Sequence, residues 1–180
     1  MNRFWNWFTI LLVVHYTTSI QFYNEYPCEI DAIQSKTVYN LKYNCNRKQL
    51  RKIFSHLSAG AFPPNGKLEG TILMNGLRNQ SMWNGKKIKY VGGVAPHDHG
   101  TLVNVLFNNR YEMFRANIHR TIAPIDGKES FVLNYKHTPM VFYIVDYLRE
   151  VQQNVYLGIM TIRPFKKIPV LYFLLEKVEE

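Results

Sequence analysis

The densest group of residues that could do chemistry is His97, Asp98 and His99, with a proline before it and a glycine after it. Two imidazoles and a carboxylate can act as acid and base, or they can bind a metal ion. A metal site would need further ligands, from His119 or His137, and nothing in the spacing brings these close. Because turn residues flank the group, an exposed loop is the favoured interpretation, and we predict no metal and no cofactor.

Asp146 and Arg149 form a second candidate, because an ion pair between them could orient the polar group of a ligand. The same pair could instead tie two strands together, which we favour. Trp83, two residues before Gly85, also has two interpretations. It either closes the floor of a core or lines a ligand cavity, and the first is favoured. The chain has no nucleophile elbow, P-loop or dinucleotide-binding glycine pattern.

Eight runs rich in Val, Ile, Tyr, Phe and Thr predict strands, and turn residues such as Asn-Gly and Asp-Gly separate several of them. The predicted strands are Lys67–Met74, Met82–Val91, Thr101–Phe107, Arg110–Ile122, Glu129–Tyr135, Met140–Val145, Val155–Arg163 and Val170–Val178. The last two are apolar on both faces, so both faces should be covered. A long antiparallel sheet loses its edges by closing. We therefore predict a mainly β fold, an antiparallel lipocalin-like (calycin-like) barrel of about 8–10 strands.

One helix should precede the barrel. Asn46 is a suitable N-cap for a helix over Arg47–Leu57, where apolar residues recur at helical spacing. The segment Thr37–Tyr43 before it is rich in β-branched and aromatic residues and predicts a short strand.

The first 19 residues have the pattern of a signal peptide. Arg3 precedes the apolar run Phe8–Val14, and Thr17 and Ser19 have the spacing of a cleavage site. An uncleaved anchor is the alternative, although the apolar run is shorter than the roughly 20 residues of a membrane span. Cleavage would leave one β-barrel domain over residues 20–180.

Entry into the endoplasmic reticulum and secretion would let Cys28 and Cys45 form a disulfide. Asn79 begins an Asn-Gln-Ser sequon and is a candidate glycosylation site. The net charge of +9 is divided among short basic groups. This division, together with secretion, argues against nucleic-acid binding and indicates weak attraction to anionic surfaces. We expect a monomer.

Two stretches carry a resemblance to a known family. Met82–Ile88, with its Trp-x-Gly-Lys core, resembles the GXWXG domain. Val141–Glu176 resembles the domain of unknown function that usually follows it, through Asp146, Arg149 and Val151. The strand Val155–Met160 and the ending Tyr172–Glu176 also match.

The resemblance spans Leu57–Glu176, with two departures: Ser81 stands where the motif has its first Gly, and Met160–Pro164 replaces a Met-Asp-x-Lys-Gly stretch. It implies small lipocalin-like barrels without an established reaction, in a family that is cytosolic in microbes. The leader and the cysteine pair would make this chain a secreted member.

The leading hypothesis is a secreted barrel that binds a small hydrophobic ligand, such as a fatty acid or a sterol, for transport or sequestration. The candidate ligand-binding residues are Trp83, Phe107, Phe114, Ile118, Phe131, Arg149, Tyr156, Met160 and Phe173. Core packing is the competing interpretation for each of them. The alternatives are a barrel enzyme that uses the His97–His99 loop or Arg149, and a solid barrel that acts through its surface.

Overall fold

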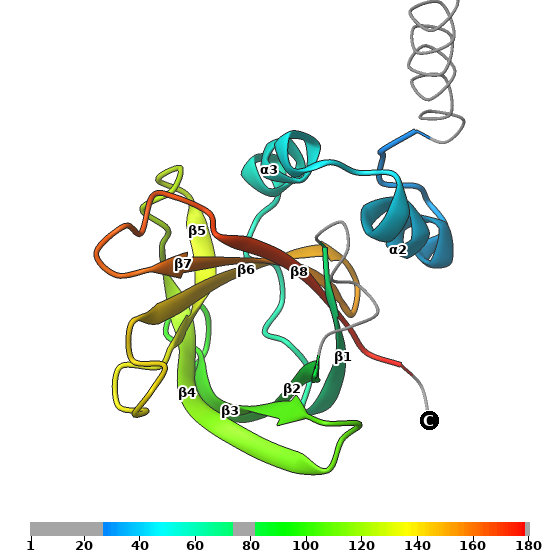
Figure 1. Cartoon of the computed structure of the whole chain (residues 1–180). Coiled ribbons are helices and arrows are strands. Elements are labelled where there is room, and N and C mark those ends of the chain that lie inside the picture. Colours follow the sequence, from blue (N-terminus) through cyan, green and yellow to red (C-terminus); the bar gives the residue numbers. More distant parts are fainter. Residues whose placement is uncertain (1–26, 74–81, 179–180) are drawn as a thin grey trace, which may run out of the picture.

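The computed structural model describes residues 27–73 and 82–178, and eight strands in these ranges form a closed antiparallel barrel (Figure 1). Each strand pairs with its neighbours in sequence, and β8 pairs with β1 to close the sheet. The strands are β1 (Gly66–Ile72), β2 (Trp83–Gly92), β3 (His99–Leu106), β4 (Tyr111–Ile122), β5 (Glu129–Asn134), β6 (Ile144–Gln152), β7 (Val155–Ile162) and β8 (Leu171–Glu176). The prediction of a lipocalin-like barrel is confirmed.

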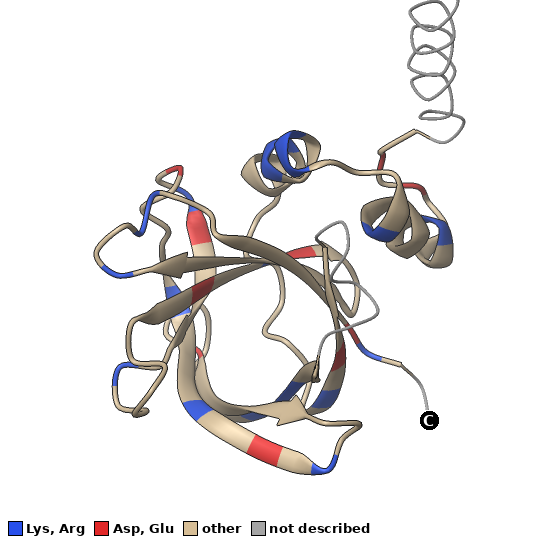
Figure 2. Ribbon diagram, viewed as in Figure 1, with Lys and Arg blue, Asp and Glu red and all other residues tan. Residues whose placement is uncertain are grey.

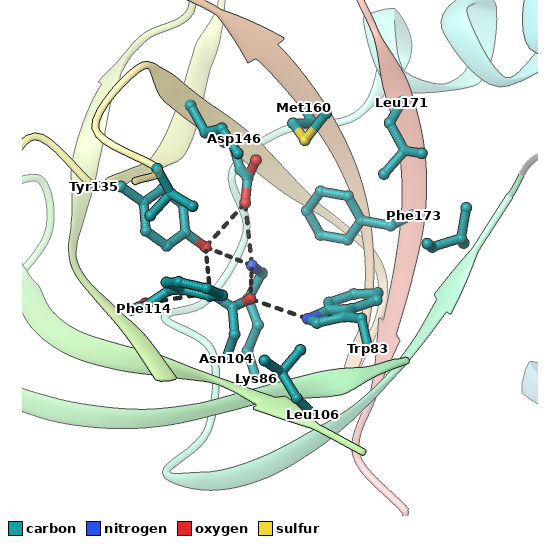
Figure 3. A pocket seen from close by; sticks show the side chains of 13 residues that line it. Trp83, Lys86, Asn104, Leu106, Phe114, Tyr135, Asp146, Met160, Leu171 and Phe173 are labelled. Atoms are coloured by element: carbon teal, nitrogen blue, oxygen red, sulfur yellow. Dashed lines mark hydrogen bonds and ion pairs between the residues drawn. The ribbon is translucent and has the colours of Figure 1, made fainter. Parts of the chain in front are cut away.

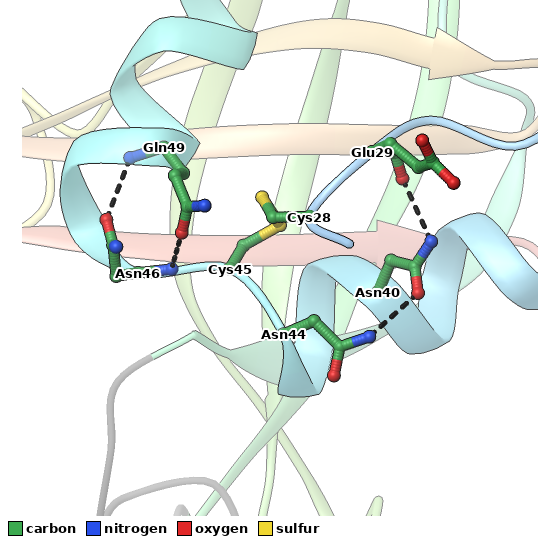
Figure 4. Close-up of a disulfide and its surroundings, with 7 residues drawn as sticks. All are labelled: Cys28, Glu29, Asn40, Asn44, Cys45, Asn46 and Gln49. Carbon is green, nitrogen blue, oxygen red and sulfur yellow. Dashed lines mark hydrogen bonds between the residues drawn. A yellow bond between two sulfur atoms is a disulfide. The ribbon is translucent and has the colours of Figure 1, made fainter. Parts of the chain in front are cut away.

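Two short helices, α2 (Gln34–Tyr43) and α3 (Arg47–His56), precede the barrel. Helix α3 is the predicted one, and Asn46 caps it: its side chain accepts a hydrogen bond from Gln49 N, and the Gln49 side chain accepts one from Asn46 N (Figure 4). This reciprocal pair satisfies amide groups that a helix start would otherwise leave without partners.

Helix α2 corrects the predicted strand over Thr37–Tyr43. Its buried residues Thr37, Asn40 and Leu41 recur at helical spacing. The Thr37 hydroxyl accepts a hydrogen bond from Asp31 N and donates one to Asp31 O, which fixes the entry to the helix. Side-chain packing and these bonds therefore override the strand preference of β-branched residues.

The predicted disulfide joins Cys28 to Cys45, so it connects the segment before α2 with the segment between the helices (Figure 4). The bridge closes a short loop around α2, and Cys45 is buried in the core beneath the helices. The proposed leader and Asn79 lie outside the described residues. Within residues 27–73 and 82–178, no helix has the length and apolarity to cross a membrane.

The barrel has two apolar cores, one inside it and one between its outer surface and the helices. The outer core joins Leu41, Leu50 and Phe54 of the helices to outward-facing residues of β6, β7 and β8. These three strands are therefore covered on both faces, as expected for β7 and β8. Figure 2 shows the positions of Lys and Arg along the ribbon, on α2, on α3 and on several strands and loops of the barrel.

Strand β6 begins and ends later than predicted. The predicted strand ended at Val145, because Asp146 and the charged residues after it are typical of the end of a strand. In the structure Asp146 and Arg149 lie within β6 and point to opposite faces, since their separation of three is odd. The ion pair between them that the sequence suggested is therefore wrong. Each has another partner: Asp146 pairs with Lys86, and Arg149 pairs with Asp126.

Arg149 points out of the barrel into the outer core and is fully buried. Its Nη1 and Nη2 lie 2.6 and 2.7 Å from the carboxylate oxygens of Asp126, and Nη1 donates a 2.8 Å hydrogen bond to Phe54 O. Burial raises the pKa of Asp126, but the hydrogen bonds from Arg149 and from the Lys128 amide, together with the positive charges of these two residues, bring that pKa below its usual value. Arg149 therefore ties the end of α3 to the turn between β4 and β5.

We predict that Arg149→Met lowers the free energy of unfolding by about 1.5–3 kcal/mol, because the carbonyl groups of Phe54, Lys128 and Glu129 lose a charged hydrogen-bond donor. Urea unfolding measures the loss. Arg110→Met is the matched control, since Arg110 is exposed, and it should change stability by about 0.5 kcal/mol or less. Equal stability of the two variants would contradict a structural role for Arg149.

Candidate ligand-binding cavity

One end of the barrel interior is packed solid. We call it the closed end, and it is the end with the turns from β2 to β3, from β4 to β5 and from β6 to β7. Its inward-facing apolar side chains fill the space between the strands. They are Leu68, Ile88, Leu102, Ala116, Ile118, Phe131, Leu133, Leu148, Tyr156 and Leu175.

The chain between α3 and β1 covers the closed end. Ala59 is fully buried against the interior core, and the Phe62 ring packs edge-on against Phe131 at 5.3 Å. Ala61 N donates a hydrogen bond to the Glu150 carboxylate at 2.8 Å. This segment therefore seals the end from solvent.

The other end of the interior is hollow, with a cavity of about 260 Å³. We call this end of the barrel the cavity end. Because neighbouring strands are antiparallel, the last residues of odd-numbered strands and the first residues of even-numbered strands lie there. Ile72, Leu106, Ile144 and Leu171 are such residues. Figure 3 shows most of the lining. The complete lining is Ile72, Trp83, Lys86, Asn104, Leu106, Phe114, Tyr135, Val141, Ile144, Asp146, Met160, Leu171 and Phe173.

A β-bulge explains how Trp83 and Lys86 both reach the cavity. Residues three apart on a regular strand face opposite sides, but the register shifts between Trp83 and Gly85, so Asn84 is an extra residue. Gly85 has a φ of 134°, and a Cβ there would lie 2.0 Å from Leu68 O. Only glycine fits this position, which explains the Trp-x-Gly-Lys spacing.

Lys86 is buried in this apolar cavity with Asp146, and each residue is 3% exposed. Lys86 Nζ lies 3.1 Å from Asp146 Oδ2, 2.6 Å from the Tyr135 hydroxyl and 2.8 Å from Asn104 Oδ1 (Figure 3). The rings of Trp83, Tyr135 and Phe173 also surround the ammonium, with centroids 5.3–5.4 Å away. The cation is thus held by polar and aromatic contacts together.

Asn104 and Tyr135 complete this polar cluster. Asn104 Oδ1 also accepts a hydrogen bond from Trp83 Nε1, and its Nδ2 donates to Tyr135 Oη and to Phe114 O. Phe114 has a positive φ at a register shift between β3 and β4, and the Asn104 amide satisfies its carbonyl. The Tyr135 hydroxyl donates to Asp146 Oδ2 at 3.2 Å.

Burial dominates the protonation of this cluster. It lowers the pKa of Lys86, and the neighbouring Asp146 carboxylate partly offsets this effect. Burial also raises the pKa of Tyr135 well above its ordinary value, and the Asp146 charge raises it further. Tyr135 therefore stays protonated and keeps its hydrogen bond to Asp146 at neutral pH.

Four of the nine predicted ligand-binding residues line the cavity: Trp83, Phe114, Met160 and Phe173. Ile118, Phe131 and Tyr156 also point inward, but they pack in the closed end. Phe107 lies in the turn after β3 and is 42% exposed, and Arg149 points out of the barrel. Alternation along a strand predicts which face a residue takes, but not which end of the barrel it reaches.

The His97–His99 loop lies away from the cavity. Asp98 is buried and forms an ion pair with Arg120, whose Nε lies 2.6 Å from Asp98 Oδ1. Arg120 also donates a hydrogen bond to Gly60 O, so the pair fastens the chain that covers the closed end. His97 and His99 are exposed. Across residues 27–73 and 82–178, no three His, Cys, Asp or Glu side chains gather as a metal site would require.

Lys86, Asn104 and Tyr135 were not predicted as ligand-facing residues, and Asp146 was considered for that role only together with Arg149. The usable signal was a polar residue in an inward-facing position: Asn104 stands between Leu102 and Leu106 on the same face of β3. Such a residue on an apolar face must have buried partners.

Comparisons with known proteins support the fold alone. No family model matches the chain, and no curated protein matches it. A solved structure of a protein from Thermomonospora curvata is similar to it, with a TM-score of 0.50 and 20% sequence identity. The alignment covers 75% of this chain and 89% of that one. Membership of the GXWXG family stays a prediction.

We predict that Lys86→Met lowers the free energy of unfolding by about 3–5 kcal/mol, because it leaves the Asp146 carboxylate buried without a cation. The double variant Lys86→Met, Asp146→Leu removes both charges and should recover most of that loss. Urea unfolding of the two variants measures the difference. A single variant as stable as the wild type would contradict a charged pair in the interior.

Proposed function

We propose that this chain binds one small, mostly apolar molecule in the cavity end of its barrel. The observation that supports this most strongly is the interior itself, which is packed at one end and hollow at the other. Protein interiors normally contain few voids larger than a water molecule. A cavity of about 260 Å³, lined mainly by aromatic and aliphatic side chains around a few polar groups, has the features of a small-molecule site.

The volume of the cavity limits the size of the ligand. An engineered apolar cavity of about 150 Å³ holds benzene, which has six carbon atoms. At that scale, about 260 Å³ holds a molecule of about ten non-hydrogen atoms. A sterol or a long-chain fatty acid is larger, so we propose a shorter aliphatic or a monocyclic or bicyclic compound.

The proposal predicts that the chain binds one naphthalene molecule and that Met160→Trp weakens this binding by about tenfold or more. Met160 lines the cavity, and an indole at that position would take up space that the ligand needs. Isothermal titration calorimetry measures both affinities.

Val91→Trp is the matched control. Val91 also belongs to a barrel strand, but it is 59% exposed, lies next to the turn from β2 to β3 and does not line the cavity, so its replacement should leave naphthalene binding unchanged. Absence of binding to the wild type, or equal weakening by both substitutions, would contradict a ligand site inside the barrel.

We also propose that the chain is secreted through the endoplasmic reticulum. The Cys28–Cys45 disulfide supports this, because such bonds persist in oxidising compartments. In eukaryotic cells, the full chain should reach the medium with Ile20 or a close neighbour at the new N-terminus. Asn79→Gln should remove a glycan that a glycosidase otherwise releases. Retention in the cytosol with reduced cysteines, read by mass spectrometry, would contradict secretion.

A further inference from the structure

The polar cluster in the cavity uses all of its hydrogen-bond donors internally. Lys86 has three N–H groups and three polar neighbours. The two N–H groups of Asn104 go to Tyr135 and Phe114, and the Tyr135 hydroxyl donates to Asp146. Trp83 Nε1 donates to Asn104. A ligand that needs a donor from this cluster would have to break one of these bonds.

One acceptor is left over. Asp146 Oδ2 accepts from Tyr135 and lies beside the Lys86 ammonium, but Asp146 Oδ1 has no hydrogen-bond partner among the described residues. Figure 3 shows no dashed line from this second oxygen of the carboxylate, which belongs to the cavity lining. Gln152 Oε1 is also without a partner, but Gln152 does not line the cavity. A buried carboxylate oxygen without a partner costs free energy that a ligand can recover.

We infer that the ligand is a neutral alcohol or phenol whose hydroxyl donates a hydrogen bond to Asp146 Oδ1 while its apolar body fills the cavity. This inference rests on the proposed function, since it names the class of ligand that the same cavity selects. The hydroxyl supplies the one kind of group that the cluster lacks, a free donor.

Charge and hydrogen-bond donation distinguish a neutral alcohol from ligands of similar size that carry a carboxylate, an ammonium or an ether. A carboxylate would bring a second negative charge beside Asp146 and would find no free donor, because Lys86 has none to spare. An ammonium would bring a second positive charge into the aromatic surroundings of Lys86. An ether has an oxygen of the right polarity but cannot donate a hydrogen bond.

The test compares 1-nonanol with methyl octyl ether and with nonanoate at neutral pH, by calorimetry on the wild-type protein. The alcohol and the ether are isomers with the same atoms and about the size that the cavity holds. We expect the alcohol to bind at least about tenfold more tightly than the ether, and nonanoate to bind more weakly than either.

The outcomes separate the two proposals. If the ether or nonanoate binds as tightly as the alcohol, the inference about the hydroxyl is wrong and the apolar site stands. If none of the three compounds binds, and naphthalene does not bind either, both proposals are wrong.

A variant provides an independent measurement. Lys86→Met combined with Asp146→Leu makes the cluster apolar without leaving a charge unpaired. In this variant the preference for the alcohol over the ether should fall to about onefold while the ether still binds. A preference that persists there would overturn the assignment of Asp146 as the acceptor.

Discussion

The structure depends on the burial of one charged pair, Lys86 and Asp146, inside an otherwise apolar barrel. Taking two charges out of water costs several kcal/mol for each, and the cost is offset only when the geometry is good and every remaining polar group has a partner. Asn104 and Tyr135 supply partners for the Lys86 ammonium, the Tyr135 hydroxyl also donates to Asp146 Oδ2, and three aromatic rings surround the ammonium.

Two irregularities of the backbone position the side chains around this pair. The bulge at Gly85 turns both Trp83 and Lys86 inward, and the irregularity at Phe114 leaves a carbonyl for the Asn104 amide. Bulges are found where a sheet must re-aim a side chain, and here two of them lie around the same cluster. At the opposite end, Arg120 and Asp98 fasten the segment that seals the barrel, and beneath α3 Arg149 and Asp126 hold the helix to a turn. Three ion pairs, each with at least one buried member, thus organise the two ends of the barrel and its outer core.

Alternation and turn residues predicted the barrel and most of its strands, because one apolar face on each of many short strands has few other solutions. The N-cap of α3 is equally local and was predicted at Asn46, although its reciprocal bond with Gln49 was not. Two features depended on distant contacts and were missed. Thr37–Tyr43 prefers a strand by composition, yet it forms a helix because Leu41 packs on the barrel. The charges of β6 suggested the end of a strand, because their partners, Lys86 and Asp126, lie far away in the sequence. The same limitation applied to the site. The aromatic lining was predicted in part, whereas the polar cluster forms only when β2, β3, β6 and the segment after β5 come together in the fold.

The central claim is that a ligand occupies the inside of the barrel, and methyl NMR of the methionines tests it most directly. Met160 lines the cavity, whereas Met82, Met113 and Met140 are exposed and are not among its lining residues. On titration with 1-nonanol, the account predicts a large shift of the Met160 methyl signal, assigned with Met160→Leu, that saturates at one ligand per chain. The three exposed methyl groups should stay in place. Shifts confined to the exposed methionines, or spread evenly over all four without saturation, would place the ligand on the surface and contradict the account.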